Sequence, residues 1–79
     1  MTSLDTLARN TPARIVAVDL GALHASEAQR LNEFGFEIDA QVESLHAGPI
    51  GRDPIAVRVG RMTIALRRAV AAQITVVPL

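Results

Sequence analysis

Cysteine is absent from the 79-residue sequence, and lysine, tryptophan and tyrosine are absent as well. Without cysteine the chain has no disulfide framework, no thiolate zinc site and no iron–sulfur cluster. A small domain without such crosslinks is typical of the reducing cytosol, so we expect a cytoplasmic protein. No apolar run approaches the roughly 18–20 residues that a membrane span needs, so we expect no direct membrane insertion. The N-terminus has neither the basic nor the apolar segment of a secretory signal peptide.

Aliphatic side chains dominate what is present. Leucine, isoleucine and valine together supply 22 residues, whereas Phe34 and Phe36 are the only aromatic ones. This content is sufficient for an aliphatic core and argues against disorder. Because single domains usually run from about 50 to 200 residues, we expect residues 1–79 to form one small domain.

The charge is zero overall but unevenly distributed. Residues 1–43 carry three arginines against seven carboxylates, a formal charge of −4, and residues 44–79 carry five arginines against Asp53, a charge of +4. A net charge of zero argues against general nucleic-acid binding, in which a basic footprint dominates affinity. The simplest interpretation is that the two halves pair with each other.

One helix is expected after residue 25. Ser26 and Gln29 match a capping box, in which Ser26 satisfies a free amide of the first turn and Gln29 reaches back. Leu31 and Phe34 then share one helical face, and Gly35 ends the helix in a left-handed conformation. Eight or nine residues make only about 12 Å of helix, too little for a bundle, so we expect a plug over the mouth of a barrel.

The strongest local signal is a β-hairpin around Gly60 and Arg61. Apolar residues alternate on both sides of this pair, and Gly-X is typical of a two-residue type II′ turn. The expected inward pairs are Val59–Met62, Val57–Ile64 and Ile55–Leu66, and the outward pairs are Arg58–Thr63 and Ala56–Ala65.

The sequence predicts about five short strands, and no long crossover segment connects one to the next. Their expected ranges are 14–20, 40–46, 55–59, 62–66 and 73–77, with helical turns at 3–8, capped by Ser3, and 68–72, and a Gly- and Pro-rich loop at 47–54. Five strands so connected predict a mainly β fold, a small and partly open barrel of about five strands with one short helix.

Chemistry-bearing residues do not form a recognisable site. His24 and His46 are the only histidines, and the spacing of three or four zinc ligands is absent. There is no nucleophile elbow and no phosphate-binding loop, and Glu33 and Glu37 are expected to be solvated. A barrel of this size is filled by its own side chains. We therefore expect no enzyme, no cofactor and no metal site.

The remaining candidate is the surface. Arg61, Thr63, Ala65 and Arg67 share the outward parity of the second hairpin strand, and Arg58 lies outward on the first. Such a row is either an ordinary solvated face or a docking face for an acidic partner, since arginine pairs with carboxylates bidentately. The loop before the hairpin is a second candidate. The partner-binding candidates are Arg52, Asp53, Arg58, Arg61 and Arg67.

Several strings resemble the FeoA family, small cytoplasmic SH3-like proteins of bacterial ferrous iron uptake. The resemblance rests on Leu4-x-x-Leu7 leading into Ile15, Arg30-Leu31-x-x-Phe34-Gly35, Pro49-Ile50-Gly51 before Asp53-Pro54-Ile55, Val57 through Arg67, Ala72, and Ile74-x-Val76. The family usually has glycine where this sequence has Asn10 and Asp39, the residue types that best replace glycine in a left-handed conformation. Gly48 and Arg52 resemble insertions in the loop before the hairpin.

The resemblance implies an accessory role for the membrane ferrous-iron transporter FeoB, exerted by protein–protein interaction from the cytoplasmic side. SH3-like domains of this type also occur at the C-terminus of metal-dependent repressors of the DtxR type. This chain has no DNA-binding helix–turn–helix, so the alternative is a stand-alone metal- or regulator-binding module. Both functions are compatible with a homo-oligomer.

Overall fold

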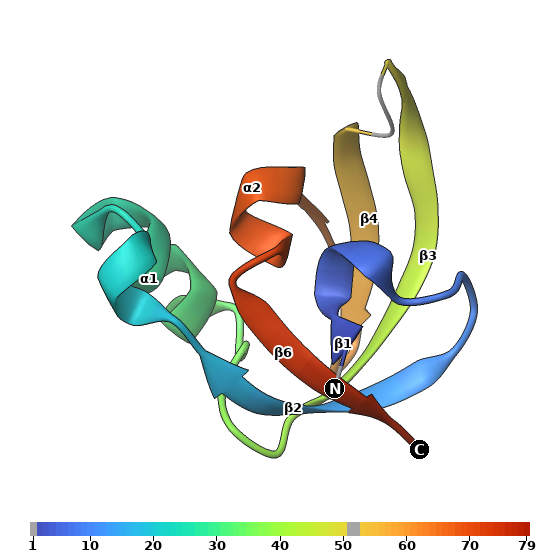
Figure 1. Cartoon of the computed structure of the whole chain (residues 1–79), viewed down its shortest axis with the longest axis horizontal. Coiled ribbons are helices and arrows are strands. Elements are labelled where there is room, and N and C mark those ends of the chain that lie inside the picture. The colour runs from blue at the N-terminus through green and yellow to red at the C-terminus, as the bar shows by residue number, and fades with distance from the viewer. Residues whose placement is uncertain (1, 51–52) are drawn as a thin grey trace.

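The strands form one antiparallel sheet of six, in the order β1-β6-β2-β3-β4-β5 (Figure 1). The computed structural model describes residues 2–50 and 53–79, and for residues 47–50 only the backbone. The strands are β1 (Thr2–Ser3), β2 (Pro12–Val18), β3 (Gln41–Ile50), β4 (Asp53–Val59), β5 (Met62–Leu66) and β6 (Ile74–Pro78). The helices are α1 (Ala25–Glu33) and α2 (Arg68–Ala71), with 3₁₀ turns at Leu4–Thr6 and Leu20–Ala22. The mainly β prediction is confirmed.

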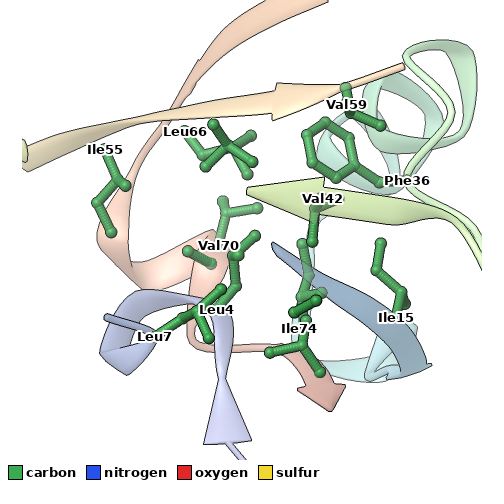
Figure 2. Packing of buried hydrophobic residues seen from close by; sticks show 14 of the residues in the cluster. Leu4, Leu7, Ile15, Phe36, Val42, Ile55, Val59, Leu66, Val70 and Ile74 are labelled. Atoms are coloured by element: carbon green, nitrogen blue, oxygen red, sulfur yellow. The ribbon is translucent and has the colours of Figure 1, made fainter. Parts of the chain in front are cut away.

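The sheet curls around a single aliphatic core. Figure 2 shows side chains from β2, β3, β4 and β6 converging with those of the N-terminal 3₁₀ turn and α2. Leu4, Ile15, Val57, Ile74 and Val76 are completely buried. Strands β1 and β5 are the two edges, so the barrel is open, as expected.

The N-terminal segment adds a sixth strand that the sequence did not indicate. Thr2 pairs with Val76 of β6, and two residues are too few to show an alternating pattern. The expected helical turn follows as the 3₁₀ turn and buries Leu4. Ser3 precedes this turn, but its hydroxyl donates to the carboxylate of Asp5 and caps no backbone amide.

The loop predicted at 47–54 is wrong over most of its length. Strand β3 continues through Ile50, which pairs with Asp53, the first residue of β4. The register of β3 against β4 shifts between Ala47 and Ile50, which places Gly48 and Pro49 at a β-bulge. Glycine and proline are compatible with a strand at such a position, because one residue there is free of ladder pairing.

The β4–β5 hairpin has the predicted register in all five pairs. Gly60 has φ +58°, and Arg61 is absent from the positive-φ residues, as a type II′ turn requires. Along β5 the inward side chains become more exposed towards the turn, from Leu66 at 7% to Met62 at 43%, whereas Val59, opposite Met62 on β4, is buried. The inward prediction therefore fails for Met62, which lies on the edge strand β5.

Helix α1 begins two residues earlier than the capping box predicted. His24 is the N-cap residue, and its backbone N–H donates to Glu27 Oε1 over 3.0 Å. The capping role assigned to Ser26 and Gln29 is therefore wrong, because both lie inside the helix on its exposed side. The end of the helix is as predicted, since Gly35 has φ +87°.

Asn10 and Asp39 both adopt left-handed conformations, with φ +61° and +73°. The backbone N–H of Asn10 donates to the carbonyl of Ser44 over 2.7 Å, and that of Asp39 donates to Ile15 over 2.8 Å. The hydrogen bond of Asn10 joins the segment before β2 to β3, and that of Asp39 joins the segment before β3 to β2. Asn10 and Asp39 thus form left-handed turns at the two positions where the family usually has glycine.

Two ion pairs form within residues 2–50 and 53–79. Arg14 Nη1 lies 2.9 Å from Asp39 Oδ1, and both residues belong to the acidic half. Arg58 Nη1 lies 3.5 Å from Glu43 Oε1 and joins the two halves. The expectation that the halves neutralise each other is thus met at one contact.

Candidate partner-binding surface

The outward face of the β4–β5 hairpin carries the predicted arginines. Arg58 on β4 lies opposite Thr63 on β5, Arg61 lies in the turn, and Arg67 follows the last residue of β5. All three arginines are exposed. At about 3.3 Å per residue, Arg61 and Arg67 are about 20 Å apart along the strand, so the arginines form a row along the hairpin.

Arg58 is the partly neutralised member of this row. It faces Glu43 on the neighbouring strand β3, and the two side chains are 55% and 23% exposed. An exposed pair of this kind contributes at most about 1 kcal/mol to stability. Arg58 thus remains accessible to a competing carboxylate.

A groove of about 490 Å³ lies at the turn end of the hairpin. Its walls come from the end of α1 at Phe34, from the start of β3, and from the hairpin residues Arg58, Arg61 and Met62. Exposed Met62 gives the groove an apolar surface beside two guanidinium groups. The arrangement suits an amphipathic, acidic partner segment.

Asp53 has a role inside the fold. Its Oδ1 accepts a hydrogen bond from the backbone N–H of Arg68 over 3.1 Å, at the first residue of α2. The carboxylate therefore satisfies an amide that a helix of one turn cannot satisfy itself. Arg52, the neighbouring candidate, lies outside the described residues.

Arg67 lines a second groove, of about 480 Å³, together with Arg30, Asp53, Pro54 and Ala65. Arg30 comes from α1 and was not among the predicted site residues. Its guanidinium carbon lies 5.8 Å from the centre of the Phe34 ring, one helical turn further along. The i, i+4 spacing of Arg30 and Phe34 on a helix is a sequence signal that could have revealed this stacking. No local pattern in the sequence could have revealed that α1 faces β5.

Within residues 2–50 and 53–79, no three histidine, cysteine, aspartate or glutamate residues gather in a way that could hold a metal ion. His24 and His46 are both exposed. Glu33 and Glu37 are exposed, as expected. None of the helices in the described part of the chain has the length and apolar content that crossing a membrane requires.

Comparison with solved structures gives close likenesses over nearly the whole chain. A FeoA protein from Chlorobium tepidum is 31% identical, with a TM-score of 0.86, over 99% of this chain and 70% of that one. FeoA of Stenotrophomonas maltophilia, described as an SH3 domain protein and solved in complex with zinc, is 34% identical. Its TM-score is 0.76, over 96% of this chain and 89% of that one.

A fold likeness extends to metal-dependent repressors. IdeR of T. acidophilum has a TM-score of 0.79 at 17% identity, over 98% of this chain and 33% of the repressor. None of the curated proteins compared matches the chain. The family model described as the FeoA domain matches residues 2–78. The matched range leaves out only the first and last residues, and the chain therefore belongs to the FeoA family.

Proposed function

We propose that this protein is a cytoplasmic accessory protein of bacterial ferrous iron uptake, which acts by binding the membrane transporter FeoB. Membership of the FeoA family supports the link to iron transport. The relative from Stenotrophomonas maltophilia is described as a candidate activating factor of ferrous iron transport. The protein acts by binding and not by catalysis.

The observation that carries this proposal is the row of exposed arginines on a rigid hairpin. Arg61 and Arg67 form no ion pair with any residue of the described ranges, and Arg58 has only a partly exposed one. The planar guanidinium group of arginine can bind a carboxylate through two parallel hydrogen bonds, so each ordered side chain makes two contacts. The proposed contact surface is Arg58, Arg61 and Arg67, with Asp53 at the start of β4; Arg52, also a candidate, lies outside the described residues.

A pull-down from membranes with tagged protein tests the proposal. The triple variant Arg58→Ser, Arg61→Ser, Arg67→Ser should stay folded and lose at most about 1.5 kcal/mol of stability, because exposed substitutions cost about 0.5 kcal/mol or less each. Recovery of the transporter should fall at least tenfold in low salt, and wild-type recovery should itself weaken as salt rises. Arg9→Ser, at another exposed arginine, is the matched control.

Wild-type recovery of the transporter by the folded triple variant would overturn the arginine face as the contact surface. Failure of the wild-type protein itself to recover the transporter would overturn the partnership.

The second candidate function is metal binding without a transporter, favoured by the zinc complex of the Stenotrophomonas relative. A ligand that binds the folded state raises the melting temperature in proportion to RT ln(1 + [L]/Kd). Titration with anaerobic Fe²⁺ and with Zn²⁺ separates the two functions. The accessory function predicts no rise with either metal, and a melting temperature that keeps rising with the logarithm of the free metal concentration would favour the metal-binding function.

A further inference from the structure

Strand β5 is the longer of the two free edges of the sheet. It spans five residues, Met62–Leu66, whereas β1 at the other edge spans only two. Edge strands of natural proteins are often blocked by a proline, a β-bulge or an embedded charge. Strand β5 contains no proline and no charged residue, and its register against β4 has no shift. These features leave the edge open to a further strand.

The backbone of β5 presents hydrogen-bonding groups on its free side. Val59 and Met62 flank a two-residue turn, and such a pair exchanges both of its hydrogen bonds. Bonding alternates along an antiparallel ladder, so Ile64 also bonds to β4, whereas Thr63 and Ala65 direct their N–H and C=O groups away from it. None of these four groups has a hydrogen-bond partner in the part of the chain that the structure describes. They form a template for an extended backbone.

The inward side chains of β5 lack neighbours on the same free side. Met62 is 43% exposed and Ile64 is only partly buried, whereas Val59 and Val57, opposite them on β4, are buried. Side chains directly opposite each other on neighbouring strands lie about 4.5–5.5 Å apart. A strand added to β5 would therefore cover Met62 and Ile64 with its own inward side chains, which favours apolar residues at alternate positions.

Open space lies along β5. The 490 Å³ groove at the turn reaches Met62, and the 480 Å³ groove at the other end of the strand reaches Ala65 and Arg67. Helix α1 contributes to the walls of both grooves, through Phe34 at its C-cap in the first and Arg30 in the second. An open strand edge beside such space is the arrangement in which peptides bind as added strands.

Charge bears on which chain can occupy the edge. Arg30 and Arg67 are balanced along the wall by Glu27 and Asp53, so the wall itself does not select by charge. If β5 paired over its full length with β5 of a second copy, the antiparallel register would place Arg61 opposite Arg67 of that copy. Like charges directly opposite each other are destabilising. The edge therefore suits a different chain, one without basic residues at these two positions.

We propose that the free edge of β5 binds an extended segment of the protein partner as an added strand, held by main-chain hydrogen bonds to Thr63 and Ala65. Alternate side chains of the segment are apolar and cover Met62 and Ile64, and its ends carry no basic residue. In this mode of recognition the main chain supplies affinity and the alternate side chains supply specificity. The inference rests on the proposed function in taking the occupant to be a segment of a protein partner.

Amide hydrogen exchange and chemical-shift titration test this edge. The probe is the acetylated, amidated peptide Glu-Val-Thr-Val-Thr-Val-Glu, which matches residues 61–67 in length and has its valines on one face. In the free protein the amides of Thr63 and Ala65 should exchange fast and those of Met62 and Ile64 slowly, because only the latter bond to β4. A saturating concentration of the probe should slow exchange at Thr63 and Ala65 at least tenfold.

Two controls isolate the main-chain contacts. The same peptide N-methylated at both threonines lacks the donors that face β5 and should bind the wild-type protein at least tenfold more weakly. In the protein, Thr63→Pro removes an N–H that the fold does not use, a change that edge strands tolerate, and should weaken binding to a similar extent. Thr63→Val keeps that N–H at the same exposed position and should bind the probe as the wild type does. Dispersion of the amide spectrum verifies that each variant is folded.

Unchanged exchange at Thr63 and Ala65 in the presence of the probe, or equal binding of the N-methylated peptide, would overturn the proposal. Slow exchange of both amides without the probe, together with a dimer in sedimentation, would show a second copy at the edge and would also overturn it.

The titration contains no transporter and is therefore independent of the pull-down. A failed titration with a successful pull-down would remove the strand-binding edge and leave the proposed function standing. A successful titration with a failed pull-down would overturn the partnership and leave the edge standing as a strand-binding site.

Discussion

The carboxylate of Asp53 holds the first backbone amide of α2, with 3.1 Å between Asp53 Oδ1 and the nitrogen of Arg68. The two residues are 15 positions apart in the chain, one at the start of β4 and the other at the start of the helix. This contact ties the start of α2, where Arg67 is the N-cap residue, to the start of β4. An acidic residue predicted as a surface contact thus positions its basic neighbour.

Replacement of Asp53 should therefore destabilise the fold. Asp53→Ala removes the acceptor of the Arg68 amide and should lower the free energy of unfolding by about 0.5–2 kcal/mol, as loss of a helix cap does. Urea denaturation measures the change. Glu33→Ala, at an exposed carboxylate of α1, is the control and should cost less than about 0.5 kcal/mol. Equal midpoints for the two variants would show that the cap contributes nothing.

The capping arrangement of α1 makes a prediction opposite to that of the sequence pattern. Glu27→Ala should cost about 0.5–2 kcal/mol because the N–H of His24 loses its acceptor. Ser26→Ala should be neutral or slightly stabilising, since Ser26 lies within the helix and alanine is the best helix former. Thermal unfolding of both variants decides between the two caps. A larger loss of stability for Ser26→Ala than for Glu27→Ala would show that Ser26 is the cap, as the sequence pattern predicted.

The hairpin turn should tolerate no side chain at Gly60. Gly60→Ala should lower the free energy of unfolding by about 1–2 kcal/mol, which is the cost of a left-handed backbone for an L-residue. Steric contact is not the reason, because a Cβ at Gly60 meets no atom within 4 Å. Gly21→Ala is the matched control, since a Cβ there makes an ordinary 3.5 Å contact with Asp19 and Gly21 is not among the positive-φ glycines. A calorimetric scan in which both variants melt together would contradict the turn type.

Asn10 should accept glycine better than alanine. Asn10→Ala keeps the backbone N–H that donates to Ser44 but forces an alanine to φ near +61°, at a cost of about 1 kcal/mol. Asn10→Gly removes that cost and should unfold within about 0.5 kcal/mol of the wild type. Guanidinium denaturation of the two variants measures the difference. If alanine and glycine gave the same midpoint, the left-handed turn would not exist in solution.

The parts of the fold that could be predicted are those encoded by neighbouring residues. The hairpin register follows from alternation on both sides of Gly60, and the end of α1 follows from Gly35. Strand β3 could not be predicted past His46, because its pairing with β4 outweighs the breaking tendency of Gly48 and Pro49. Local composition describes a propensity, whereas a β-bulge depends on the partner strand.

The candidate site shows the same division. Exposure of Arg58, Arg61 and Arg67 follows from strand parity and could be predicted from the sequence. The convergence of Arg30 with Arg67 could not, because 37 positions separate them and the helix is placed against β5 by tertiary packing. The structural role of Asp53 was hidden for the same reason, since its partner is on another element.

The order of synthesis and the order of strands in the sheet are at odds. Strand β6 is the last element of the chain, yet Val76 pairs with Thr2 on one side and with Ile15 on the other (Figure 1). During translation β1 has no partner, and β2 has only β3, until residues 74–78 have left the ribosome. The contacts that complete the core therefore join the two ends of the chain and carry a high contact order, which is typical of β-proteins that fold in milliseconds to seconds. Loss of the final strand would leave β1 without a partner and β2 with β3 alone, and it would uncover Leu4, so a nascent chain halted before β6 exposes apolar surface that chaperones recognise.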